Sequence, residues 1–196
     1  MKKVLEMFSV PKSNKIFISF LTIIAVISGS LFFFKLTLDD QNLLKTYIEG
    51  LVINNEYNSL ISILGFNFFL VLIIWLLGIS IIGVVLNLFI YFTKVFIMSL
   101  EVTSLVNLYS TKGILIALAE FFPHQIVNLL IFSILVIYSI NVSLNLIIAI
   151  LKKKTICFNE IMKSYNKVFI YATIFIVITV IYEYYLAPLI LKLVFN

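Results

Sequence analysis

Ionisable side chains interrupt and border an otherwise apolar stretch of the sequence, residues 95–122. Glu101, Lys112 and Glu120 lie within the stretch, and His124 follows it after Pro123. An ionisable group at membrane depth costs roughly 2.5–3.5 kcal/mol on insertion scales, so such groups are functional candidates by default. The spacing predicts either a proton or ion path at a broken helix, as in transporters, or charges at the membrane interface that are paired or snorkel. We favour the second interpretation.

Other catalytic signatures are missing from the sequence. Zinc takes three or four ligands, whereas the chain has one histidine and one cysteine, Cys157. There is no H-E-x-x-H, G-x-S-x-G, P-loop or dinucleotide-binding motif. The four carboxylates within residues 35–62 show no pairing suited to glycan cleavage. We therefore expect no catalytic residues, no metal, no cofactor and no enzymatic activity.

A second polar set lies on the apolar stretch 124–151. Asn128 stands near its start, and Asn141 and Asn145 are four residues apart, as are two serines. Polar side chains at this spacing share one helix face and usually hydrogen-bond across to a neighbouring helix. A substrate-lined cavity is the alternative, and packing is the favoured interpretation.

The composition predicts the elements that must position these residues. Of 196 residues, 63% are hydrophobic and only 12% are charged, whereas soluble chains are about a quarter charged. The apolar residues form runs of about 20, the length that a helix needs to cross a hydrocarbon layer, and lipid offers the backbone no hydrogen-bond partners. The predicted fold is all-α: a single polytopic bundle of about five transmembrane helices. The predicted spans are residues 16–34, about 66–92, a broken or re-entrant element at 95–122, 124–151 and 168–187.

Two glycines and one lysine mark the positions at which the predicted helices bend or break. Gly78 and Gly83 fall inside the predicted span 66–92, where they permit a bend or a close helix contact. Lys112 and the glycine after it look like a break in 95–122, giving two half-helices or a span plus a short re-entrant piece.

The distribution of lysine predicts the orientation. All the basic residues are lysines, and ten of them, Lys94 included, lie in segments that share one side if the N-terminus is inside. This rule explains the net charge of +5 better than nucleic-acid binding does. The predicted segments are a cytoplasmic N-terminus (1–15), an extracytoplasmic amphipathic loop (35–62), a cytoplasmic basic loop (152–167) with its own amphipathic stripe, and an extracytoplasmic tail (188–196).

Three segments together resemble the stage II sporulation protein M family. Residues 75–83 (WLLGISIIG) resemble its second span, residues 120–128 (EFFPHQIVN) its Pro-His turn before the fourth span, and residues 182–188 (YEYYLAP) its last span. The likeness covers nearly the whole chain. Much of the wider family has Gly and then Glu after Pro-His, where this chain has Gln125 and Asn128.

The resemblance implies a non-catalytic scaffold in the cell membrane at the sporulation septum. Such a scaffold would anchor peptidoglycan-degrading partners, the stage II sporulation D and P proteins, during endospore engulfment. Small and polar faces at Gly78, Gly83, Asn141 and Asn145 would then dock partner helices. The alternative is a small permease-like subunit that uses the broken element and the pair Glu120 and His124, working as a homo-oligomer or with a partner ATPase.

Overall fold

The structure is a computed structural model that describes residues 11–52, 59–120, 122–152 and 158–186. In these ranges every regular element is a helix. The helices are α2 (Lys12–Phe33), α3 (Leu38–Val52), α4 (Leu60–Gly78), α5 (Gly83–Glu120), α6 (Phe122–Lys152) and α7 (Phe158–Tyr185). All but α3 are long and apolar enough to cross a membrane. The predicted fold class, a helical membrane bundle with about five spans, is confirmed.

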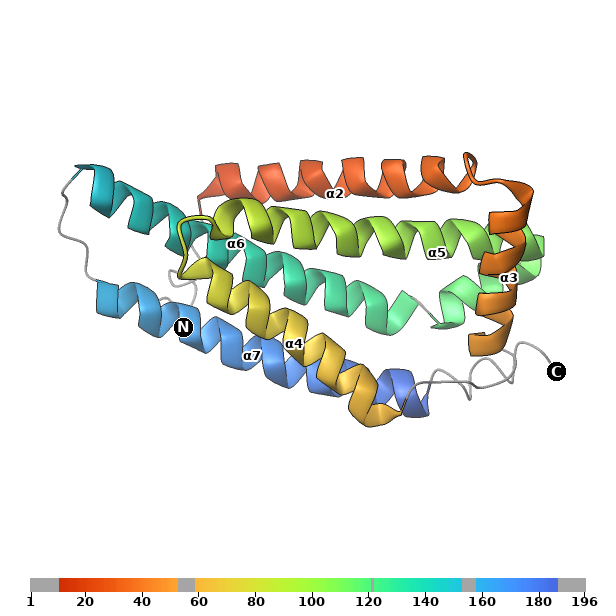
Figure 1. Cartoon of the computed structure of the whole chain (residues 1–196). Coiled ribbons are helices and arrows are strands. Elements are labelled where there is room, and N and C mark those ends of the chain that lie inside the picture. The colour runs from red at the N-terminus through yellow and green to blue at the C-terminus, as the bar shows by residue number, and fades with distance from the viewer. Residues whose placement is uncertain (1–10, 53–58, 121, 153–157, 187–196) are drawn as a thin grey trace.

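The bundle has two packed groups of helices that share α6. Figure 1 shows α2 beside α5 along one side and α4 beside α7 along the other, with α6 between them. The centre of the second group is fully buried and aliphatic, with Val71 on α4, Leu135 on α6 and Ile176 on α7. Large apolar side chains also cover the outside of the helices, which is the pattern expected where the solvent is lipid.

Hydroxyl groups and a glycine hold α2 against α5. The hydroxyls of Thr22 and Tyr91 are 2.8 Å apart, and those of Ser30 and Ser99 are 2.9 Å apart. A Cβ at Gly29 would collide with the backbone of α5, so the two helices approach closely at this point. Both pairs join residues separated by 69 positions, which fixes the register of two helices running in the same direction.

The predicted span at 66–92 is wrong, because the chain reverses in the middle of it. Helix α4 ends at Gly78 and α5 begins at Gly83. The turn is closed by backbone hydrogen bonds from Ser80 to Leu77 and from Gly83 to Ser80. A Cβ at Gly83 would overlap the Leu77 carbonyl, so the reversal needs glycine there. The same correction moves Lys94 from the predicted inner segment into the interior of α5.

The predicted break in residues 95–122 is confirmed, two residues before the predicted position. Ser110 has φ 52° and ψ −126°, which interrupts the helical backbone of α5. The chain then folds back, since a Cβ on Gly113 would collide with the carbonyl of Leu105. Leu105 and Ile116 pack together in a small separate core. The last part of α5 therefore turns back towards the start of α6 (Figure 1).

Helix α3 crosses one end of the bundle, beside the ends of α2 and α5 (Figure 1). Its start is capped by Thr37, whose hydroxyl accepts a hydrogen bond from the Asp40 N–H, and its first turn carries Asp39 and Asp40, which the helix dipole favours. The helical face predicted within 35–62 is thus present. At the other end of the chain, the amphipathic stripe predicted within 152–167 forms the first turns of α7, continuous with the last span.

Candidate functional site

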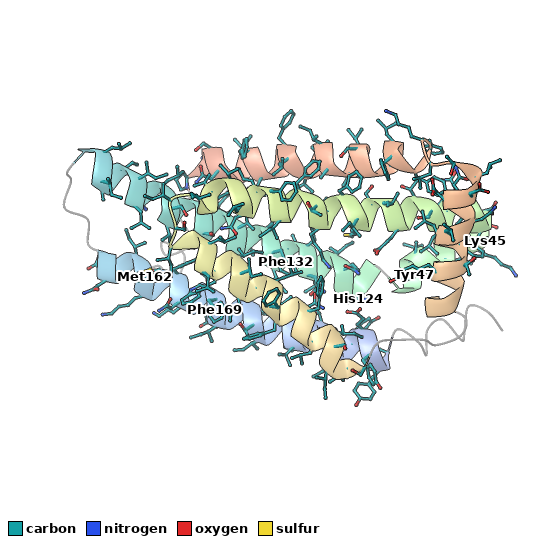
Figure 2. The ribbon with its side chains drawn as sticks, in the orientation of Figure 1. Lys45, Tyr47, His124, Phe132, Met162 and Phe169 are labelled. Atoms are coloured by element: carbon teal, nitrogen blue, oxygen red, sulfur yellow. The ribbon has the colours of Figure 1, made fainter. Side chains whose placement is uncertain are left out.

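His124 lies in the first turns of α6 and is 97% buried, at 3% exposure. Figure 2 shows it inside the outline of the bundle, at the beginning of the helix. Its Nε2 is 3.9 Å from the Glu183 Oε2 on α7, and its ring centroid is 6.1 Å from that of Tyr182. The Nδ1 of His124 is buried without a hydrogen-bond partner among the described residues. Among the described residues this imidazole therefore has a carboxylate near its Nε2 and no hydrogen-bond partner at its Nδ1.

Two more charged side chains face this pair from α5. Lys94 interacts electrostatically with Glu101, with His124 and with Glu183. Glu101 follows Lys94 by seven residues, about two turns, so both project from one face of α5. The four residues Lys94, Glu101, His124 and Glu183 come from three helices, and we call them the His124 cluster.

The His124 cluster lies inside the membrane region and close to one end of it. By the register of α2 with α5, Lys94 is level with Ala25, near the middle of α2. Glu183, in contrast, is two residues before the end of α7. Its side chain is 25% exposed, whereas that of His124 is 2% exposed. The cluster is thus reached through Glu183, from the end of the bundle at which α7 ends and α6 begins.

Asn128 lies one turn after His124 and is held between helices. Its side-chain oxygen accepts a hydrogen bond from the Thr179 hydroxyl of α7 at 2.6 Å. Both residues are buried. Asn128 therefore ties α6 to α7 directly below the cluster, as the packing interpretation of the polar helix face predicts.

A second set of polar side chains lies at the C-terminal end of α4, away from the His124 cluster. The Tyr165 hydroxyl donates to the carbonyls of Ile74 and Trp75, at 3.2 and 2.9 Å, and the Ser143 hydroxyl donates to the Gly78 carbonyl at 2.9 Å. Asn87 donates to Ser139, which donates to the Ile74 carbonyl. We call Asn87, Ser139, Ser143 and Tyr165 the Tyr165 layer.

The Tyr165 layer completes the C-terminal end of α4. The last four carbonyls of a helix have no partner within it, and lipid supplies none. Here the Trp75 carbonyl accepts from the Tyr165 hydroxyl and the Gly78 carbonyl from the Ser143 hydroxyl. The carbonyls of Leu76 and Leu77 accept from backbone N–H groups of the turn. Every carbonyl in the last turn of α4 is therefore satisfied.

The two glycines predicted to dock partner helices are used inside the protein. A Cβ at Gly78 would overlap the Tyr165 hydroxyl and the Ser139 hydroxyl, and one at Gly83 would also approach Ser143. Both glycines are buried. The docking hypothesis is wrong for these two positions.

The remaining predicted residues are scattered. Lys112 is exposed beside the break in α5, and Asn141 and Asn145 are half-buried on α6. The side chains of Glu120 and Pro123, and the whole of Cys157, lie outside the described residues. Among the predicted site residues the structure therefore brings Glu101 and His124 into one cluster and leaves Lys112 outside it.

Four residues that sequence reasoning did not select are central to these two groups. The sequence analysis places Lys94 in an inner segment, Glu183 within the segment 182–188 and Tyr165 on the amphipathic stripe of 152–167, and it does not select Asn87. One signal was present for Lys94, which is a single charge inside an apolar run. In the described part of the chain no three His, Cys, Asp or Glu side chains are grouped so that they could hold a metal ion.

The fold and these interior groups define the class of the protein: a multi-pass helical membrane protein with a charged cluster between its spans. No family model matches the chain, no curated protein matches it, and no solved structure matches it.

Proposed function

We propose that the chain is a non-catalytic membrane scaffold that anchors and localises peptidoglycan-degrading partners during endospore engulfment. By the resemblance described above, the partners are the stage II sporulation D and P proteins. The proposed location is the septal and mother-cell membrane, with the N-terminus inside and the C-terminus outside.

The observation that carries the proposal is the surface of α3. This helix crosses the end of the bundle and leaves Leu38, Leu43 and Tyr47 more than 60% exposed. Figure 2 shows Tyr47 on α3 at this end. An exposed apolar and aromatic surface is typical of protein–protein interfaces. In the proposed orientation α3 faces the compartment in which wall enzymes work.

The first test is a deletion strain imaged with a membrane dye during sporulation. We expect septa that form normally and membranes that then stall or bulge without engulfing. Normal engulfment in the deletion strain would contradict the proposal.

The second test assigns the docking to α3. Replacing Leu43 and Tyr47 by serine removes apolar area from the exposed face, so co-purification of the partners should fall at least tenfold. The matched control replaces Asn42 and Thr46, exposed and equally spaced on the same helix, by serine and alanine. Equal recovery of partners with both variants would exclude α3 as the docking surface.

A second candidate function is a small permease-like subunit, and the His124 cluster is the observation that favours it. Ionisable groups between spans mark ion and proton pathways in many transporters. Flux of protons or small cations into vesicles that contain the purified chain, abolished by Glu183→Gln, would support this function over the scaffold.

A further inference from the structure

We propose that the Glu183 carboxyl binds one exchangeable proton within the membrane region, with the His124 Nε2 as its acceptor. The site is the His124 cluster, and the ligand class is a single proton. The proposal is independent of the scaffold function, because proton binding is measured on the protein alone.

The charge count within the cluster requires a cation. Glu101 and Glu183 carry two negative charges when ionised, Lys94 carries one positive charge, and a neutral His124 adds none. One excess negative charge remains. A buried charge without a counter-charge is costly, and such a group neutralises instead. One proton brings the described cluster to zero net charge.

Among the described residues, Lys94 is the cation that interacts with both carboxyl groups of the cluster. The range of α4 has no ionisable side chain. Helix α2 carries its lysines, Lys12 and Lys15, at its opposite end. The other described titratable groups towards this end of the bundle are Lys35 just after α2, Tyr91, Tyr109 and the exposed Lys112 on α5, Tyr138 on α6, Tyr182, Tyr184 and Tyr185 on α7, and Asp39, Asp40, Lys45 and Tyr47 on α3. Those near the start of α7 are Glu160, Lys163, Tyr165, Lys167 and Tyr171.

Helix dipoles select the atom that holds the proton. Glu183 lies in the last turn of α7, where the negative end of the dipole disfavours a carboxylate. His124 lies in the first turn of α6, where the positive end disfavours an imidazolium. Both effects place the proton on the carboxyl oxygen and leave the imidazole neutral.

The geometry suits such a pair. The Oε2–Nε2 distance of 3.9 Å is about 1 Å longer than a hydrogen bond, so the two side chains are neighbours that form a hydrogen bond once they approach by that amount. Among the described residues the Nδ1 of His124 has no hydrogen-bond partner, so no described group fixes which ring nitrogen of the neutral imidazole carries its hydrogen. A hydronium ion in the adjacent water gives its proton to a Glu183 oxygen: one O–H bond of hydronium breaks, one forms on the carboxyl group, and a water molecule remains. Release of the proton to water is the reverse step. The partial exposure of Glu183 gives it access to water.

The test is infrared spectroscopy of the full chain in lipid nanodiscs near neutral pH, in H2O and in D2O. We expect a C=O stretch of a protonated carboxyl that shifts in D2O. Glu183→Gln should remove this band. Glu183→Asp should retain it at a shifted frequency, and the control Glu160→Gln, at an exposed position on the same helix, should leave it unchanged. A native chain without the band, or a band that persists in Glu183→Gln, would overturn the proposal.

A further variant tests the charge count. Lys94→Met removes the only positive charge of the cluster, so the second carboxyl should also take up a proton and the band should grow about twofold. An unchanged band in folded Lys94→Met protein would contradict the count. If the band is absent and sodium chloride, but not choline chloride, raises the melting temperature, the cluster holds a sodium ion and the proton proposal is wrong.

Discussion

The Tyr165 layer, which is buried, and the His124 cluster, which is partly buried, are both polar and shared between spans, yet they are built differently. In the Tyr165 layer neutral hydroxyl and amide groups donate to carbonyls near the end of α4, and two of these, on Trp75 and Gly78, have no partner within the helix. In the His124 cluster charged groups lie near one another, the His124 Nε2 is 3.9 Å from the Glu183 Oε2, and the His124 Nδ1 has no hydrogen-bond partner among the described residues. The first arrangement gives hydrogen-bond donors to the backbone carbonyls at the end of α4. The second leaves one negative charge without a counter-charge.

The difference indicates what each region contributes. Each neutral hydrogen bond between spans stabilises the fold by a modest amount. In the Tyr165 layer these bonds also hold the turn between Gly78 and Gly83, where Ser143 donates to the Gly78 carbonyl. A cluster of charges that do not cancel stabilises a fold poorly. With one excess negative charge it is suited to binding a cation. One unpaired acceptor, the side-chain oxygen of Asn87, is the exception in the Tyr165 layer, and it carries no charge.

The largest effect is expected at Gly78. In Gly78→Ala the added methyl group overlaps the Tyr165 and Ser139 hydroxyls, so the free energy of unfolding should fall by about 2 kcal/mol. The matched control is Gly65→Ala, because nothing lies within 4 Å of a Cβ at Gly65. Unfolding by SDS in mixed micelles measures both. Equal stability of the two variants would show that α4 and α7 do not pack as closely as the structure has them.

A smaller effect is expected when the cap of α4 loses one donor. Tyr165→Phe removes the hydroxyl that serves the Trp75 carbonyl and leaves that carbonyl buried without this partner. The free energy of unfolding should fall by about 1 kcal/mol. Tyr171→Phe is the control, since Tyr171 is 56% exposed on the same helix. No difference between the two would mean that the Tyr165 hydroxyl does not act as a cap.

Sequence reasoning predicted the fold class, a helical face within residues 35–62 and a break at Lys112 and Gly113, since long apolar runs, amphipathic spacing and isolated charges are local signals. It failed at Gly78 and Gly83. Two glycines at this spacing are compatible with either a bent span or a reversal of the chain. Which of the two forms depends on the carbonyls that Tyr165 and Ser143 reach from other helices.

The His124 cluster was only half predicted for a similar reason. His124 and Glu101 were selected because charges are rare in apolar runs. Lys94 and Glu183 are equally visible, but their importance comes from the register of α5 with α2 and from where α7 ends. Those relations join residues dozens of positions apart, and spacing along a single helix contains no information about them.

The smallest effect, and an opposite sign, is expected in the His124 cluster. The double variant Lys94→Met/Glu101→Gln removes one charge of each sign and keeps side-chain volume, so stability should change by less than about 1 kcal/mol or rise. Lys94→Met alone should be less stable than the double variant, since it leaves two carboxyl groups without their lysine. The exposed pair Lys163→Met/Glu160→Gln on α7 is the control, with a change close to zero. A loss above about 2 kcal/mol in the cluster's double variant would show that its charges stabilise the fold as the Tyr165 layer does, and the contrast between the two regions would fail.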